Sequence, residues 1–216
     1  MPASLTPDLA EPATLKSLFL PIAGEATIGL AVSGGPDSLA LMLLARRWVV
    51  SAGSAPRIVV YSLDHGLRPE AADEVAMVAE EAAKLGFEFR GLKWSEGHPE
   101  TGVQEAARQA RYRLIGAAMA ADGAKVLLTA HHRADQAETI LMRLAHGSGL
   151  DGLKGMVPFS EVEGVRVFRP LLDVEPAALG AIVEEAGLSP ALDPSNNDEG
   201  YERVRWRRLL PALAKE

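Results

Sequence analysis

The chain has 216 residues, of which 24% are charged and 48% hydrophobic, and its net charge at pH 7 is −7. This length suits one α/β domain with at most a small extension, and the acidic balance argues against a generally basic nucleic-acid binder while allowing local basic surfaces. The absence of cysteine excludes disulfides, thiolate metal sites and cysteine nucleophiles, and it favours a cytoplasmic protein. No apolar run approaches the roughly 18 residues of a membrane span, and the N-terminus lacks the basic region of a signal peptide, so no membrane association is predicted.

Short apolar runs alternate with helical patterns in the first two thirds of the chain. The predicted strands cover residues 28–32, 57–63, 87–92 and 124–130. The predicted helices cover residues 13–20, 38–50, 70–85, 102–121 and 135–146. This alternation predicts an α/β fold with a doubly wound, mostly parallel sheet and flanking helices. In such sheets the ligand lies beyond the carboxyl ends of the strands.

After residue 146 the pattern changes. Four glycines within residues 147–156 predict a mobile loop rather than a strand or helix. Beyond it, the sequence predicts a small hairpin that turns at residues 163–164 and helices at residues 176–187 and 202–213. We therefore expect an α/β core at residues 1–146, followed at residues 147–216 by a Gly-rich loop and a small helical C-terminal extension of the same catalytic domain.

The most informative residues join the first core strand to the helix that follows it. They are Ser33, Gly34, Gly35, Pro36, Asp37 and Ser38. Two glycines let the backbone turn tightly and bring its N–H groups close to an anion, and the helix N-terminus adds about half a positive charge. The loop resembles the SGGxDS loop of the ATP pyrophosphatase superfamily, whose members split ATP into AMP and pyrophosphate. The alternative is that Asp37 only caps the helix.

Carboxylates and histidines lie at the carboxyl ends of other predicted strands. Asp135 and Glu138 are three residues apart and so share a helix face. They fit a capping box, with Asp135 as the N-cap, but beside a phosphate loop they also fit Mg²⁺, which binds one or two carboxylates plus substrate phosphates. We expect His65, His131 and His132 to shape the site or bind substrate rather than a metal, because no metal-ligand spacing is present.

Arginines gather on two of the predicted helices. Arg108 and Arg111 share a face, which fits either contact with a triphosphate or RNA backbone or a solvated surface paired with glutamates. The last helix region contains four arginines and two aromatic residues, namely Arg203, Arg205, Arg207, Arg208, Tyr201 and Trp206. Interleaved aromatic and basic side chains suit an RNA surface. Packing of this helix onto the core is the competing interpretation.

Together these motifs resemble the tRNA(Ile)-lysidine synthetase family. The resemblance rests on SGGPDS (33–38), LDHGLR (63–68), GVQEAARQARY (102–112), the block at 130–156, RPLL (169–172) and DPSNNDEGYERVRWR (193–207). It implies an adenine nucleotide alpha-hydrolase-like fold and a two-step ligase. ATP adenylates the C2 oxygen of the wobble cytidine in the CAU anticodon of tRNA(Ile), and pyrophosphate leaves. The ε-amine of free L-lysine then displaces AMP and forms lysidine.

The resemblance also implies roles for individual residues. The six loop residues would bind ATP, and Asp37 would hold Mg²⁺ and take part in catalysis. Asp135 and Glu138 would serve metal binding or lysine activation, with the roles undivided between them. Contacts with substrate or tRNA are expected from Arg108, Arg111, His131, Arg203, Arg205, Arg207 and Arg208. Family members usually carry further domains after this core that help to bind the tRNA. The resemblance therefore predicts the ATP chemistry of this chain more firmly than its full affinity for tRNA.

Two other functions stay open at this point. One is a different PP-loop enzyme acting on tRNA, such as a thiolase, although these enzymes usually need cysteine for sulfur transfer. The other is a non-enzymatic nucleotide-binding sensor module, which would not need carboxylates beside a phosphate loop. The expected partners are ATP, free L-lysine and tRNA(Ile); the sequence leaves open whether the chain is a monomer or a homodimer.

Overall fold

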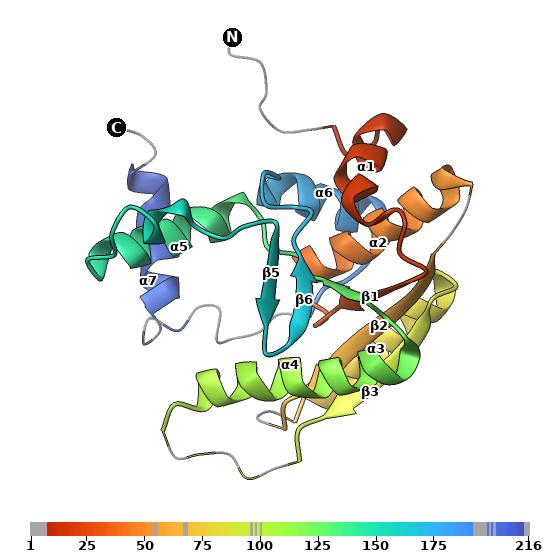
Figure 1. The fold of residues 1–216 in the computed structure, drawn as a ribbon, viewed down its shortest axis with the longest axis horizontal. Helices are drawn as coiled ribbons and strands as arrows, with labels where there is room; N and C mark the ends of the chain where they lie inside the picture. Colours follow the sequence, from red (N-terminus) through yellow and green to blue (C-terminus); the bar gives the residue numbers. More distant parts are fainter. Residues whose placement is uncertain are drawn as a thin grey trace.

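The computed structural model describes residues 8–53, 56–66, 69–95, 97, 99, 101–191, 198, 200 and 202–213. Six strands form one sheet in the order β3-β2-β1-β4-β6-β5 (Figure 1). The strands are β1 (Thr27–Ala31), β2 (Arg57–Asp64), β3 (Glu88–Lys93), β4 (Val126–Leu128), β5 (Phe159–Val162) and β6 (Val165–Phe168). Every neighbouring pair is parallel except β5 and β6, which are antiparallel. The predicted α/β fold with a mostly parallel sheet is confirmed.

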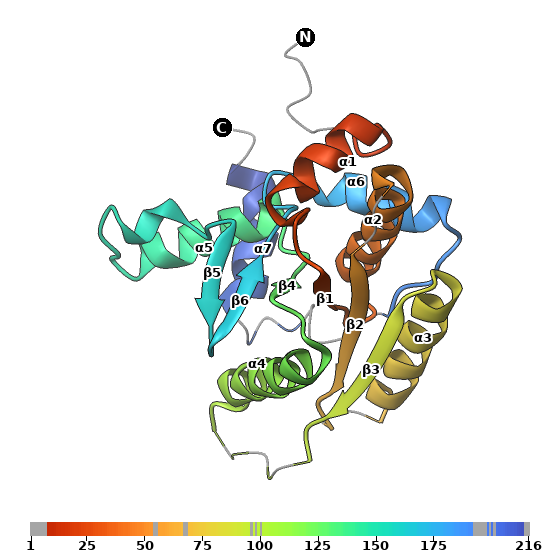
Figure 2. The same ribbon diagram turned by 45° about the vertical axis from the view of Figure 1, so that its right-hand side comes forward.

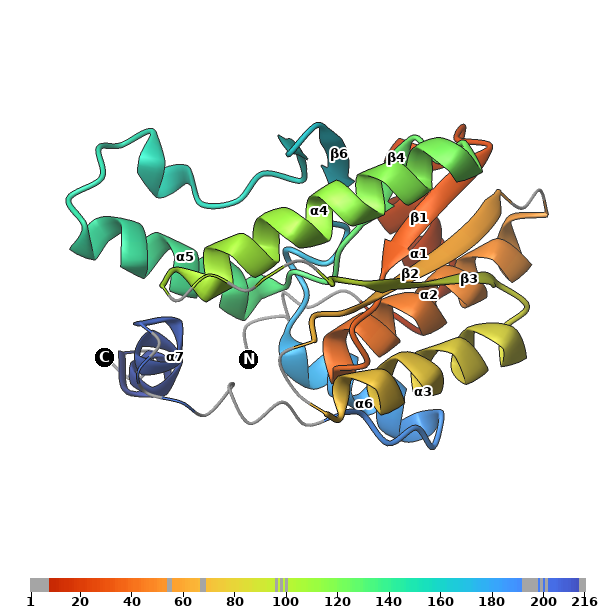
Figure 3. The same cartoon turned by 90° about the horizontal axis from the view of Figure 1, so that it is seen from below.

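Helices cover both faces of this sheet. They are α1 (Pro12–Phe19), α2 (Pro36–Ala52), α3 (Ala71–Lys84), α4 (Val103–Asp122), α5 (Arg133–Ala145), α6 (Pro176–Glu185) and α7 (Glu202–Leu213), with short 3₁₀ helices at Leu20–Ile22 and Gly152–Lys154. Helices α2, α3 and α6 lie on one face and α4 on the other (Figures 1 and 3). Helices α5 and α7 pack together beyond the β5–β6 edge (Figures 1 and 2). None of the described helices is long and apolar enough to cross a membrane.

The side chains of β2 show why the central strands read as continuous apolar runs. Ile58 and Val60 belong to the large core that includes residues of α1, α2, α3 and α6. Val59 and Tyr61 point to the other face, where they pack with α4 residues such as Ile115. Both faces of a parallel sheet are covered, so alternation between apolar and polar residues disappears. Each fully buried Val or Ile contributes roughly 1.5–3 kcal/mol, so these strands contribute substantially to stability.

The segment after residue 146 contributes to the same sheet. The predicted hairpin turns at Glu163 and Gly164, whose φ angles of 49° and 74° fit a two-residue turn with both central residues left-handed. Strand β6 then pairs in parallel with β4, through Leu127–Val167 and Leu128–Phe168. Sequence patterns predict the hairpin, but its place in the parallel sheet is a finding of the structure.

Two local predictions are corrected. The glycine-rich segment contains a short 3₁₀ helix and is tied to α5, because Arg143 donates to the carbonyls of Gly152 and Gly155 at 2.7 and 2.8 Å. Helix α5 begins at Arg133 rather than Asp135. Tyr201, with part of the motifs at 63–68 and 193–207, lies outside the described residues.

Candidate active site

The glycine loop connects the end of β1 to the start of α2 and is held by one of its own hydroxyls. Ser38 Oγ accepts a hydrogen bond from Ser33 N at 3.2 Å and donates to the carbonyl of Gly35 at 2.9 Å. Gly35 is the N-cap of α2, and because glycine has no side chain, the N–H groups of the first turn receive no hydrogen bond from the cap residue's side chain. The N–H groups of that turn therefore have the orientation that an anion needs. The interpretation in which Asp37 serves only as the helix cap receives no support, because Gly35 holds that position.

Gly34 gives the loop its sharp bend. Its φ is +88°, and a Cβ there would lie 3.1 Å from Met77 Cε. Gly35 has φ −70°, and a Cβ would meet only Ser33 Oγ, at 3.8 Å. The loop conformation therefore requires glycine at position 34 but accommodates a Cβ at position 35.

Gly34→Ala is expected to lower the free energy of unfolding by about 1–2 kcal/mol, the cost of a left-handed conformation for a residue with a Cβ. Gly35→Ala is the matched control and is expected to change stability by less than about 0.5 kcal/mol, because the smaller entropy of the unfolded chain offsets poorer capping by alanine. Urea denaturation of both variants measures the difference. Equal losses would contradict the assigned role of Gly34.

Three strand ends contribute to a cavity of about 290 Å³. Its lining includes Ser33, Gly35, Pro36, Asp37, Ser38, His65, Arg108, Arg111, Tyr112, Thr129 and His131. The structure thus brings five of the six loop residues together with Arg108, Arg111 and His131, as ligand binding at the carboxyl edge of the sheet requires. Gly34 acts through the backbone, and its carbonyl accepts a hydrogen bond from Ala191 N at 3.0 Å.

Helix α4 supplies positive charge to this cavity. Arg111 Nη2 lies 3.0 Å from His65 Nε2, and the Arg108 guanidinium lies 5.2 Å from the centre of the Tyr112 ring. Neither arginine has a carboxylate partner within the described part of the chain. Guanidinium groups in this position suit a phosphate, which accepts paired hydrogen bonds from arginine.

His132 links the glycine loop to helix α5. Its Nε2 lies 3.5 Å from Asp37 Oδ2, and its Nδ1 lies 3.6 Å from Asp135 Oδ2. Burial works to lower the pKa of His132, but the hydrogen bond to Asp37 and the charges of Asp135 and Glu138 raise this pKa above its ordinary value. His132 is buried and joins the two predicted acidic positions, a role that sequence reasoning missed. The sequence signal for this role was the position of His132 directly before helix α5, where an N-cap residue lies.

Asp135 and Glu138 have different surroundings, which the sequence did not separate. Asp135 Oδ2 accepts from His132 N at 3.0 Å, and Asp135 N donates to His132 Nδ1 at 3.4 Å, so these two residues form the capping box of α5. The predicted box of Asp135 and Glu138 is wrong, because the helix starts two residues earlier. Glu138 is fully buried and binds Arg203 Nε at 2.7 Å and Arg207 Nε at 2.6 Å.

The predicted RNA-binding arginines of α7 therefore fall into two groups. Arg203 and Arg207 face α5, with their Nη2 atoms 3.7 and 3.8 Å from Asp135 Oδ1 in addition to the bonds with Glu138. Arg205 Nη1 donates to the carbonyl of Gly200 at 3.1 Å, and both Arg205 and Arg208 are exposed. The acidic partner of Arg203 and Arg207 is therefore Glu138, which belongs to α5.

Among the described residues that line the cavity, one carboxylate is suitable for a metal ion. No group of three or more His, Asp or Glu side chains capable of holding a metal occurs among the residues that the structure describes. Asp37 is the acidic residue in the lining of the cavity, and its side chain is 39% exposed. One such carboxylate beside bound phosphates is a common arrangement for Mg²⁺, so the site fits this ion. The three histidines have different contacts: His65 lies beside Arg111, His131 beside Thr129, and His132 between Asp37 and Asp135.

His131 is expected to make stability depend on pH. Burial lowers its pKa from 6.5 to about 4, while its Nδ1 lies 2.9 Å from Thr129 Oγ1. The unfolded chain binds a proton at this residue at pH values where the folded chain does not, so stability falls as the pH falls below 6.5 toward 4. The slope from this group is at most about 1.4 kcal/mol per pH unit. Urea denaturation between these pH values should show a flatter dependence for His131→Asn, and parallel curves would contradict the assignment.

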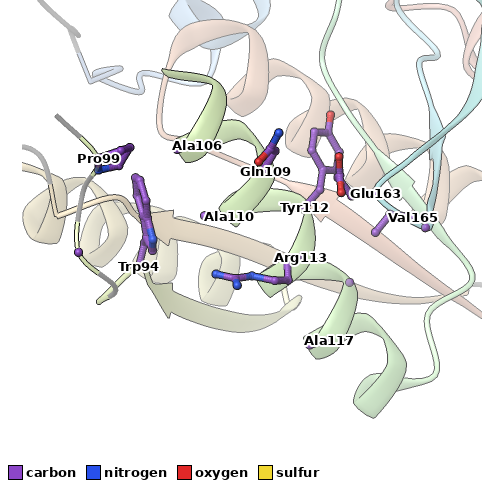
Figure 4. Close-up of a pocket in the computed structure, with 13 residues that line it drawn as sticks. Trp94, Pro99, Ala106, Gln109, Ala110, Tyr112, Arg113, Ala117, Glu163 and Val165 are labelled. Carbon is purple, nitrogen blue, oxygen red and sulfur yellow. The ribbon is translucent and has the colours of Figure 1, made fainter. Parts of the chain in front are cut away.

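A larger cavity, of about 600 Å³, lies on another side of α4 (Figure 4). Trp94, Gln109 and Arg113 line it, and Arg113 extends toward the side where Trp94 lies. It shares Tyr112 with the first cavity but contains none of the predicted site residues. Size alone does not select the site here, and the first cavity has the phosphate loop, the carboxylate and the converging arginines.

Curated relatives of this chain are tRNA(Ile)-lysidine synthases. A tRNA(Ile)-lysidine synthase from Bradyrhizobium sp. strain BTAi1 is 48% identical over 204 residues, which cover 94% of this chain and 57% of the relative. The synthase from Rhodopseudomonas palustris is 50% identical over 201 residues, covering 93% of this chain and 58% of the relative. The chain thus spans 57–58% of the length of these curated relatives. The resemblance drawn from the motifs is confirmed.

Solved structures show the same fold at low sequence identity. The U34-tRNA thiolase NcsA from Methanococcus maripaludis has a TM-score of 0.76 at 13% identity, over 94% of this chain and 72% of that chain. The NH3-dependent NAD synthetase from Campylobacter jejuni has a TM-score of 0.55 at 13% identity, over 96% of this chain and 89% of that chain. A family model described as a PP-loop domain matches residues 9–213. The loop at the end of β1 and this match across almost the whole chain show that the chain belongs to the PP-loop domain family.

Proposed function

We propose that the chain is the catalytic part of a tRNA(Ile)-lysidine synthase. One observation carries the proposal: the glycine loop, Asp37, Arg108, Arg111 and His131 converge on a single cavity. Relatives with this name, at 48–50% identity, support the choice of reaction among those open to a PP-loop domain. The substrates are then ATP, free L-lysine and the wobble cytidine of a tRNA(Ile) with a CAU anticodon.

In the first step, the C2 oxygen of the cytidine attacks the α-phosphorus of ATP and the bond to pyrophosphate breaks. The N–H groups at the start of α2 and the loop residues Ser33 and Ser38 bind the phosphates. Arg108 and Arg111 lie across the cavity and stabilise the negative charge that moves to the leaving group. Asp37 would hold Mg²⁺, which when bound neutralises part of the pyrophosphate charge.

In the second step, the ε-amine of lysine attacks C2 of the cytidine and the bond to AMP breaks. The ammonium group must first lose a proton, and a carboxylate base suits this transfer. We assign it to Asp135, because its Oδ1 has only long contacts, at 3.7 and 3.8 Å, with Arg203 and Arg207. Both oxygens of Glu138, in contrast, bind these arginines at 2.6 to 3.3 Å. Glu138 acts as a positioning residue that fixes α7 against α5. His132 connects the carboxylates of Asp135 and Asp37, because its backbone N–H donates to Asp135 Oδ2 at 3.0 Å and its Nε2 lies 3.5 Å from Asp37 Oδ2.

The proposal is tested by measuring AMP release with ATP and a tRNA(Ile) transcript, with and without free lysine. AMP formation that requires both tRNA and lysine is the expected result. A sensor module would release no AMP, and a thiolase would be indifferent to lysine. Arginine and ornithine in place of lysine serve as controls for the length and chemistry of the attacking amine.

A further inference from the structure

Arg169 directly follows strand β6 and is a buried charge. It is 6% exposed, and its Nη1 donates to the carbonyl of Val157 at 3.0 Å and to Ser160 Oγ at 2.9 Å. Its Nε has no hydrogen-bond partner in the described parts of the chain, and no carboxylate there forms an ion pair with it. A buried charge in this state is costly unless another group compensates it. Arg169 opens the RPLL motif, to which the reaction above gives no role.

Arg169 lines a cavity of about 300 Å³ that adjoins the glycine-loop cavity. The two cavities share Arg108 and His131. The lining of the second cavity consists of Arg108, His131, Thr139, Arg143, Gly155, Met156, Val157, Ser160, Arg169 and Arg203. Four of these residues are arginines, and none is an aspartate or a glutamate.

The positive charge of this second cavity is only partly neutralised. Arg203 binds Glu138, but Arg143 donates to backbone carbonyls and Arg108 lies over the ring of Tyr112. Burial lowers the pKa of Arg169, and the nearby charge of Arg108 lowers it further. Both effects indicate that an anion in this cavity would be strongly stabilised.

We propose that this second cavity binds a backbone phosphate of the RNA substrate, next to the nucleotide that reacts with ATP. This inference rests on the proposed function. A phosphodiester carries a full negative charge and accepts paired hydrogen bonds from arginine. Arg169 is the buried anchor of the phosphate, and the shared residues Arg108 and His131 place it beside the reacting groups.

The carboxylate of free lysine is the competing anion, and the charges of the cavity disfavour it. Free lysine carries two ammonium groups at neutral pH because their pKa values lie above 7. Its net charge is positive, and the described lining residues include four arginines and no carboxylate to receive the ammonium groups. A phosphate brings no positive charge, so it complements the lining without this repulsion.

The test compares two arginines of the same chain segment. Arg169→Gln removes the buried charge, and Arg166→Gln is the matched control on β6, where Arg166 is half exposed and pairs with Glu25 at 2.8 Å. Binding of an anticodon stem-loop RNA with a CAU loop is titrated at several salt concentrations without ATP. Arg169→Gln should weaken binding and flatten the slope of log K against log salt by about 0.7, the value for one single-strand phosphate contact. Arg166→Gln should leave the slope unchanged.

Three results would overturn the assignment. An unchanged slope in folded Arg169→Gln would mean that Arg169 only supports Val157 and Ser160. A raised KM for lysine with an unchanged RNA slope would assign the cavity to the amino acid. If Arg169→Gln does not fold, Arg108→Gln is used instead, because Arg108 lines the same cavity and its side chain is exposed. An unchanged salt slope in Arg108→Gln would then overturn the assignment. The proposed function fails by a different readout, namely the absence of lysine-dependent AMP release from the unaltered chain.

Discussion

Replacing Asp37 by Asn is expected to preserve the fold and to slow ATP-dependent adenylation by at least ~100-fold, the scale of losing one transition-state electrostatic contact. Asn has the shape of Asp and can still bond His132 Nε2, which lies 3.5 Å from Asp37 Oδ2. It lacks the negative charge that would hold Mg²⁺ beside the phosphates. Single-turnover measurement of AMP-linked tRNA, with the melting temperature recorded in parallel, checks both parts of the expectation.

The matched control is Asp151→Asn. The Asp151 side chain is 95% exposed, and among the residues that the structure describes it pairs only with Lys154 in the same turn, so its loss should change neither adenylation nor stability. Adenylation by Asp37→Asn near the rate of the unaltered chain at saturating Mg²⁺ would rule out the metal role. A large fall in melting temperature would instead show that Asp37 supports the fold.

Asp135→Asn and Glu138→Gln are expected to separate chemistry from structure. Asn at position 135 keeps an oxygen to accept from His132 N, so the cap survives and the melting temperature should hold. The general base is lost, and lysine-dependent AMP release should fall by 10²- to 10⁴-fold. Adenylation without lysine should change less, because that step does not use the base.

Glu138→Gln should act on stability first. Its carboxylate is fully buried, whereas the side chains of Arg203 and Arg207 are 42% and 44% exposed and can turn to water, which limits the cost. We expect a loss of about 1.5–3 kcal/mol, the worth of hydrogen bonds to a charged group, and a fall in melting temperature of about 2–4 °C per kcal/mol. Thermal unfolding and AMP release are measured on both variants. Unchanged stability in Glu138→Gln, or full activity in Asp135→Asn, would reverse the assigned roles.

The sequence predicts the sheet and the loop because their signals are local. Strand β2 is apolar on both faces, and the glycine loop has its six residues in one run. The partners of Glu138 lie 65 and 69 residues away, so no local pattern reveals that a buried carboxylate holds Arg203 and Arg207. The cap of α5 was missed because histidine is not a usual N-cap residue, and only the fold places His132 between Asp37 and Asp135.

The β5–β6 hairpin also combines a local feature, which the sequence predicts, with a long-range pairing, which it does not. Positive φ angles at Glu163 and Gly164 follow from a turn that the sequence predicts. The pairing of Val167 with Leu127 joins segments 40 residues apart and depends on the whole sheet being assembled. Arg169 follows β6 directly and is buried in the assembled sheet. The sequence alone gives this motif residue no role, whereas the structure makes it a candidate phosphate ligand.

The proposed reaction joins lysine to the wobble cytidine of tRNA(Ile). The most direct measurement is mass spectrometry of nucleosides from a tRNA(Ile) transcript with a CAU anticodon, after incubation with the chain, ATP, Mg²⁺ and isotope-labelled lysine. We expect a cytidine that carries the label at the wobble position, labelling that is at least ~100-fold slower with Asp37→Asn, and no labelled cytidine in a transcript with a different first anticodon base. A transcript that stays unlabelled while ATP is converted to AMP would contradict the proposed reaction and indicate another acceptor.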